Sequence, residues 1–152
     1  MNRNDRAAGA RSALTRVSDV MHRGVVTCDA SRPCAAVART MAAHRIHSVI
    51  VTRTDAVPRV VTDADLLEAL HAGTFEGSTA DDIAHEPAFV RLSDSLDDVV
   101  ERMHEQGTTH AVVIGNFLRL IGVVSVLDIA AAVEEKGSLG TVAADESKEV
   151  RR

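Results

Sequence analysis

Apolar and polar residues follow the same order twice along this chain, and the second copy lies 62 to 63 residues after the first. Stretches with apolar residues at helical spacing alternate with short β-branched runs, as expected of helices and buried strands. The elements predicted for the first copy are a turn at 17–21, strand 25–27, helix 31–43, strands 48–51 and 60–61, and helix 62–71. Each copy is therefore expected to run strand–helix–strand–strand–helix.

The second copy follows a predicted linker at residues 74–79. Its expected elements are a turn at 80–83, strand 88–90, a helix capped by Ser93 or Ser95, strands 111–114 and 121–124, and helix 125–135. Ser31 is the expected N-cap of the first long helix, with Pro33 in its first turn. Gly73 and Gly137 are positioned to end the two closing helices.

The duplication predicts an α+β fold of two βαββα repeats. The expected division is an N-terminal arm at 1–16, a first repeat at 17–76, a second repeat at 77–137 and a C-terminal tail at 138–152. A repeat of about 60 residues buries little surface alone, so the two are expected to pack together with pseudo-twofold symmetry. Such packing would leave clefts between the repeats, where ligands are commonly bound.

Composition narrows the classes of function. The chain is 45% hydrophobic but only 2% aromatic, so it offers few rings on which nucleic-acid bases can stack. Its net charge of −5 also argues against a nucleic acid or an anionic membrane as partner. The sequence has no apolar run of spanning length and no signal-peptide core, so a cytoplasmic protein is expected. Cys28 and Cys34 are expected to be free thiols.

Each copy ends its strand pair at a hydroxyl residue that is followed three positions later by Asp. The segment VVTDADL contains Thr62 and Asp65, and VVSVLDI contains Ser125 and Asp128. This pattern can be a helix N-cap with a carboxylate at the third helical position. The same carboxylate can accept hydrogen bonds from two vicinal hydroxyls, and the helix start favours an anion. The two interpretations are compatible, and the sequence leaves both open.

Taken together, these features resemble a tandem pair of CBS domains, named for cystathionine β-synthase and also called a Bateman module. The resemblance covers residues 17–137 and is carried by the Asp19-Val20-Met21 start, the element order and the duplicated hydroxyl-x-x-Asp motif. The first copy departs from the family pattern at Arg59, where Gly is usual and where the second copy has Gly122.

The resemblance implies an adenosine-containing ligand, namely AMP, ADP, ATP or S-adenosylmethionine, and no cofactor is expected to be required. No metal is expected, because no Cys or carboxylate pairs with the histidines at a familiar metal-ligand spacing. The ribose would be bound by Asp65, Asp128, Thr62 and Ser125. The adenine pocket would be lined by Val26, Thr27, Val49, Phe89, Val90 and Val112. The candidates for phosphate contacts are His47, His110, Arg45, Arg53 and Arg119.

The favoured function is a stand-alone regulatory protein, an energy or metabolite sensor that binds its ligand between the repeats and signals to a separate, unknown protein partner. A homodimer is expected through the apolar helix faces of Leu66, Leu67, Leu70, Ile129, Ala132 and Val133. The alternative is a structural or interaction module with vestigial clefts, which Arg59 favours. An enzyme is not expected, because the sequence has no nucleophile–base pair, P-loop or metal-ligand set.

Overall fold

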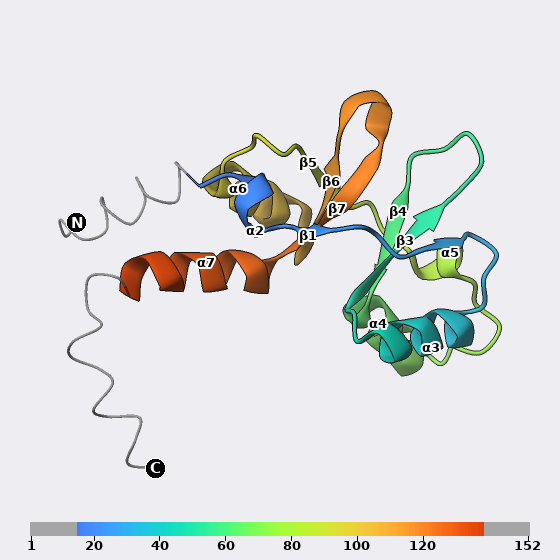
Figure 1. Cartoon of the computed structure of the whole chain (residues 1–152). Coiled ribbons are helices and arrows are strands. Elements are labelled where there is room, and N and C mark those ends of the chain that lie inside the picture. The colour runs from blue at the N-terminus through green and yellow to red at the C-terminus, as the bar shows by residue number, and fades with distance from the viewer. Residues whose placement is uncertain (1–14, 139–152) are drawn as a thin grey trace, which may run out of the picture. The chain divides into compact units, whose positions relative to one another are not determined.

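The structure is a computed structural model that describes residues 15–138, so nearly all of the predicted arm and tail lie outside the described residues. Helices and two separate sheets give an α+β fold, which confirms the predicted class (Figure 1). The chain divides into two compact units. Unit 2 is Gly24–Pro87, and unit 1 combines the residues up to Arg23 with those from Ala88 onward.

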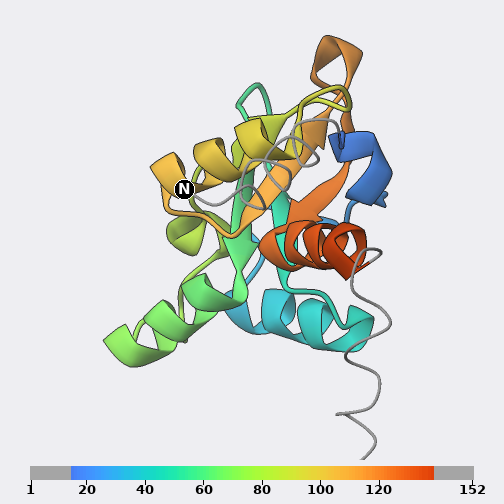
Figure 2. The same ribbon diagram turned by 90° about the vertical axis from the view of Figure 1, so that its left-hand side faces the viewer.

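Unit 2 is built on a three-stranded sheet in the order β2-β3-β4, in which β2 is parallel and β4 antiparallel to β3. Its elements are β2 (Thr27–Asp29), α3 (Cys34–His44), β3 (Ser48–Thr52), β4 (Arg59–Thr62), α4 (Asp63–Ala72) and α5 (Ala80–Ile83). Both views show α3 and α4 at the end of this sheet away from the β3–β4 turn (Figures 1 and 2). The buried core of the unit is formed by Val37, Met41, Val49, Val51, Val61, Ala80 and Ala84.

Unit 1 has a four-stranded sheet in the order β1-β7-β6-β5. Its elements are α2 (Val17–Val20), β1 (His22–Arg23), β5 (Ala88–Val90), α6 (Leu96–Gln106), β6 (His110–Ile114), the 3-10 turn η1 (Asn116–Leu118), β7 (Leu120–Ser125) and α7 (Val126–Ser138). The β6–β7 hairpin projects to its tip at η1 (Figure 1). The core is formed by Val17, Ala88, Val90, Leu96, Val99, Met103, Ala111, Val113, Val124 and Ile129.

The first short helix of each sequence copy joins the unit formed by the other copy. In unit 1 the Val17 N–H donates to the Asp94 carbonyl at 3.0 Å, and in unit 2 the Ala80 N–H donates to the Arg32 carbonyl at 2.7 Å. The segment after each helix then pairs with a strand: β1 pairs with β7, and His85 forms a β-bridge with Val60. These backbone hydrogen bonds therefore determine which residues belong to each unit. Each unit contains the first helix of one sequence copy and the remaining elements of the other.

Several predicted boundaries shift. The expected cap Ser31 lies in a turn, because the Arg32 N–H donates to the Asp29 carbonyl and α3 begins only after Pro33, its N-cap residue. Of the two proposed caps for α6, Ser95 is the one used, since its side chain accepts from the Asp98 N–H. The closing helix α7 passes through Gly137 and ends at Ser138, so the glycine does not stop it.

Gly122 is required by the close approach of β1. A Cβ atom there would lie 2.1 Å from the carbonyl oxygen of His22 and 2.5 Å from Cε of Met21. At the equivalent positions of unit 2, 63 residues away, Arg59 replaces the glycine and Ala84 replaces the methionine. Unit 2 therefore has its large side chain on the strand, where the Arg59 guanidinium bonds to the carbonyls of Asp81 and Ala84.

Replacing Gly122 with alanine should lower the free energy of unfolding by about 1–3 kcal/mol, because β1 must move away from β7 to admit the methyl group. Urea denaturation measures the change. Gly115→Ala is the matched control, because the close neighbours of its Cβ, at 2.6 and 3.3 Å, would be side-chain carbons of Ile121, and the nearest backbone atom would be in ordinary contact at 3.8 Å. Equal losses in the two variants would contradict the proposed role of close strand approach.

The two cysteines are free, and burial raises the pKa of both thiols. Cys34 is fully buried, whereas Cys28 is partly exposed. Because the raised pKa lowers the thiolate fraction near neutral pH, alkylation of the native protein should be slow and should accelerate as pH rises. Mass spectrometry after iodoacetamide treatment should find Cys28 modified before Cys34, with the difference lost in urea. Earlier modification of Cys34 would contradict its burial.

Candidate functional site

Each unit contains one corner where a strand ends at a hydroxyl residue and a helix begins. We call Thr62, Asp65 and His85 in unit 2 the Asp65 corner, and Ser125, Asp128 and His22 in unit 1 the Asp128 corner. Thr62 ends β4 before α4, and Ser125 ends β7 before α7. All four predicted ribose-binding residues therefore lie at these two corners.

One oxygen of each motif carboxylate caps its helix. Asp65 Oδ2 accepts from the Thr62 N–H at 2.7 Å and from its hydroxyl at 3.0 Å. Asp128 Oδ2 accepts from the Ser125 N–H at 2.8 Å, while the Asp128 N–H donates to Ser125 Oγ at 3.2 Å. The capping interpretation is therefore confirmed at both corners, and it fixes how each carboxylate is presented.

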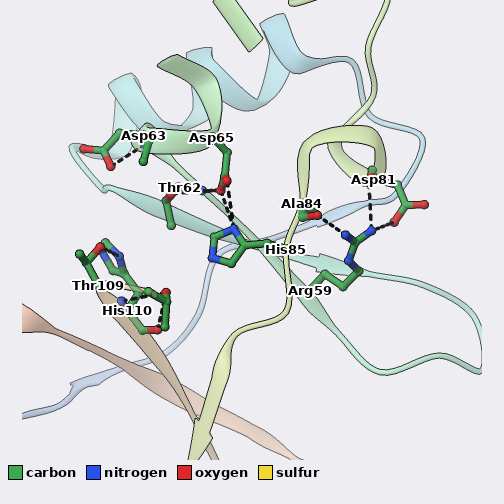
Figure 3. Close-up of polar contacts among 11 residues, drawn as sticks. Arg59, Thr62, Asp63, Asp65, Asp81, Ala84, His85, Thr109 and His110 are labelled. Carbon is green, nitrogen blue, oxygen red and sulfur yellow. Dashed lines mark hydrogen bonds and ion pairs between the residues drawn. The ribbon is translucent and has the colours of Figure 1, made fainter. Parts of the chain in front are cut away.

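A histidine contacts each capping carboxylate. His85 Nδ1 lies 3.0 Å from Oδ1 and 2.9 Å from Oδ2 of Asp65, as the close-up shows (Figure 3). His22 Nε2 lies 2.8 Å from Asp128 Oδ1. An ionised carboxylate can only accept, so the ring nitrogen is the donor in each pair. The Asp65 and Asp128 side chains are only 19% and 17% exposed, whereas His85 and His22 are 34% and 78% exposed.

The sequence prediction did not include these histidines. His22 and His85 occupy equivalent positions, 63 residues apart and just after the first helix of their copies. Each belongs to the copy opposite to its carboxylate partner, because the first helices are exchanged between the units. Their spacing of 63 residues matches the repeat and could have been noticed in the sequence. It indicates a contact with the motif carboxylates only when the first helices are known to be exchanged between the units.

Arg59 binds the end of helix α5. Its guanidinium donates to the Asp81 carbonyl at 3.1 Å, to Asp81 Oδ1 at 3.3 Å and to the Ala84 carbonyl (Figure 3). Arg53 Nη1 also approaches the Asp81 carboxylate at 3.5 Å. Arg59 is therefore a structural cation that fixes the segment leading to His85.

The phosphate candidates fall into two groups. His47 and His110 lie next to the corners: the His47 carbonyl accepts from the Asp63 N–H, and His110 is the strand partner of Ser125. His47 is exposed and its ring pairs with Asp63 at 3.2 Å, whereas His110 is buried and its Nδ1 lies 3.0 Å from the Thr109 hydroxyl (Figure 3).

Two of the three arginine candidates, Arg53 and Arg119, are not brought to these corners within their own units. Arg53 follows β3 and Arg119 precedes β7, so each lies at the opposite end of its antiparallel strand pair from the corner hydroxyl. Arg45 is the exposed C-cap of α3, in a left-handed conformation with φ 52°.

The residues predicted to line the adenine pocket differ in burial. Val49 and Val90 belong to the cores of their units, and Val112 is fully buried. Val26 and Phe89 are partly buried and Thr27 is exposed, so these three retain accessible surface.

Within residues 15–138, no group of three or more His, Cys, Asp or Glu side chains is arranged to hold a metal ion. No helix in the same part of the chain is long and apolar enough to cross a membrane.

The chain belongs to the CBS-domain family. The family model matches twice, at residues 17–72 and 80–135, which confirms the tandem arrangement inferred from the duplicated motifs. Comparison with curated protein sequences finds no match.

Solved CBS structures resemble the whole pair. A CBS-domain protein from Pyrobaculum aerophilum in complex with AMP is 25% identical, with a TM-score of 0.69 over 80% of this chain and 99% of that one. A CBS-domain protein from Agrobacterium tumefaciens is 28% identical, with a TM-score of 0.68 over 78% and 98%. Hypoxic Response Protein I, solved with two coordinated zinc ions, is 27% identical, with a TM-score of 0.64 over 77% and 98%.

Replacing Arg59 with methionine keeps the apolar part of the side chain but leaves the Asp81 and Ala84 carbonyls without this donor. We expect the free energy of unfolding to fall by about 1–2 kcal/mol, the range for a partly exposed charged hydrogen bond. Arg53→Met is the control, because Arg53 contributes only a long, exposed ion pair worth about 0–0.5 kcal/mol. Equal, small losses in urea denaturation would contradict a structural role for Arg59.

Proposed function

We propose that this protein is a regulatory CBS pair that binds an adenosine-containing ligand at the Asp65 and Asp128 corners. The observation that carries the proposal is that both units present the motif carboxylate in the same way. Oδ2 is fixed in the helix cap, and a histidine approaches the carboxylate: His22 at Oδ1 of Asp128, and His85 at both oxygens of Asp65. The AMP complex of the Pyrobaculum relative supports AMP as the first ligand to test.

The chemistry of the corners suits a ribose. Its vicinal hydroxyls are paired donors, and a carboxylate oxygen has two acceptor positions. The cap prevents the carboxylate from turning away, so little side-chain freedom is lost when the diol binds. A phosphate would find His47 beside the Asp65 corner and the N-terminal end of α4, whose dipole favours an anion. ADP, ATP and S-adenosylmethionine share the adenosine of AMP and differ from it in the group attached to the ribose, so they require different protein contacts there.

The proposed role is to sense this ligand and pass its state to a partner protein, without catalysis. Exposed apolar residues on both closing helices support a homodimer contact. They are Leu67 and Leu70 on α4, and Leu127 and Val133 on α7. The face expected for this contact is narrower than the sequence indicated, because Ile129 is buried in its own core and Leu66 and Ala132 pack against their cores.

An interaction module without a ligand is the second candidate. The observation that favours it is the His–Asp pair at each corner, since a carboxylate already bonded to a histidine has less need of a ligand hydroxyl. The two candidates differ in whether the carboxylates contribute to nucleotide affinity.

AMP at about 100 times its dissociation constant should stabilise the protein by about 2.7 kcal/mol, seen as a rise of several degrees in the melting temperature. Asp65→Ala and Asp128→Ala should each abolish or weaken binding at their own corner, measured by calorimetry on protein verified as folded by circular dichroism. The double variant should not bind. ADP, ATP and S-adenosylmethionine are compared in the same assay.

Asp97→Ala is the control, because Asp97 is an exposed carboxylate in the first turn of α6 and lies at neither corner. It should keep wild-type affinity. Undiminished binding by the folded double variant would overturn the proposed site. Absence of binding by every adenosine-containing probe would favour the interaction module.

A further inference from the structure

We propose that His22 and His85 are internal competitors for the ligand, and so determine its affinity at the two corners. The proposal rests on the proposed function, since it concerns the same carboxylates. His22 donates to Oδ1 of Asp128, the oxygen that the helix cap leaves available. His85 Nδ1 lies 3.0 Å from the uncapped Oδ1 and 2.9 Å from the cap-bound Oδ2 of Asp65. A ribose diol must therefore displace the imidazole from Oδ1, or share this oxygen with it, in order to bind.

The hydrogen bonds at each carboxylate support competition rather than a passive contact. Asp128 Oδ2 is used by the Ser125 N–H, and Asp65 Oδ2 accepts both the N–H and the hydroxyl of Thr62. These bonds hold the helix start, so they remain when a ligand arrives. The bond from histidine is the one that can be exchanged without losing the cap.

The two corners differ in how firmly the histidine is held. His22 is 78% exposed and touches one oxygen of Asp128, whereas His85 is 34% exposed and lies within 3.0 Å of both oxygens of Asp65. The His85 backbone is also fixed, because its N–H and carbonyl both bond to Val60 at 2.9 Å. The Asp65 corner is therefore the more strongly occupied, and the Asp128 corner is the one that a ligand fills first.

The charged side chains beside the Asp65 corner have partners of their own. At the Asp65 corner, Asp63 at the start of α4 is paired with His47, and Arg59 is engaged with the end of α5. His47 and Arg59 thus have partners other than Asp65, whose own side-chain partners within the described residues are the Thr62 hydroxyl and His85. At the Asp128 corner, His22 is the histidine that bonds to the carboxylate.

The test is calorimetric titration of the full chain with AMP. Removing a competing hydrogen bond should tighten binding by roughly two- to tenfold, the range for one such bond. His85→Ala should give a larger gain than His22→Ala. To assign each change, His22→Ala is measured with Asp65→Asn, which leaves the Asp128 corner intact, and His85→Ala is measured with Asp128→Asn.

Conservative variants separate competition from a general structural effect. His22→Gln places an amide donor near the position of Nε2, and His85→Asn places one near that of Nδ1, so both should retain wild-type affinity. His104→Ala and His44→Ala are exposed controls at the ends of α6 and α3, and both should leave affinity unchanged.

Unchanged or weaker AMP binding in both alanine variants, with wild-type binding present, would overturn the competition while leaving the proposed function in place. Equal tightening in the glutamine and asparagine variants would overturn it as well. If neither the wild type nor any histidine variant binds AMP, ADP, ATP or S-adenosylmethionine, both the proposed function and the competition are wrong. Binding that appears only in the alanine variants would support the competition most strongly.

Discussion

The hydrogen bonds that attach the first helix of each copy to the unit of the other copy determine much else in this chain. Through Val17 in unit 1 and Ala80 in unit 2, these backbone contacts position the segment that follows the helix. That segment then pairs with the strand leading to the hydroxyl-x-x-Asp motif. Its histidine is thereby brought onto a carboxylate from the other sequence copy, so each corner is built from both copies.

The same attachment explains the departure from the family pattern. In unit 1 the strand and the attached segment approach so closely that a Cβ at Gly122 would meet the His22 carbonyl oxygen and Met21. Unit 2 places Arg59 on the strand and Ala84 on the segment, and the guanidinium bonds to the carbonyls at the end of α5. Arg59 thus has structural partners at the end of α5, and its presence alone is no argument for a vestigial site.

Much of the fold could be predicted from the sequence, because side-chain patterns report local structure. The spacing of Val37 and Met41 and the β-branched runs gave the helices and strands, and Gly73 ends α4 in the left-handed conformation as expected. The exchange of helices could not be predicted, since it depends on backbone groups that every sequence possesses. The motif residues of the corners could be identified because each hydroxyl residue and its Asp lie in one short segment. His22 and His85 were missed because only the exchange of the first helices brings them to these carboxylates. Arg53 and Arg119 were proposed from charge alone, and antiparallel pairing places them at the far ends of their hairpins.

The central claim is that the capping carboxylates also bind the ribose of an adenosine-containing ligand. A crystal structure of the protein grown with AMP tests it most directly. The account predicts ribose hydroxyls within about 3 Å of Oδ1 of Asp128, with the Ser125 cap intact and the His22 ring turned away. AMP bound elsewhere, with both His–Asp pairs still formed, would contradict the account.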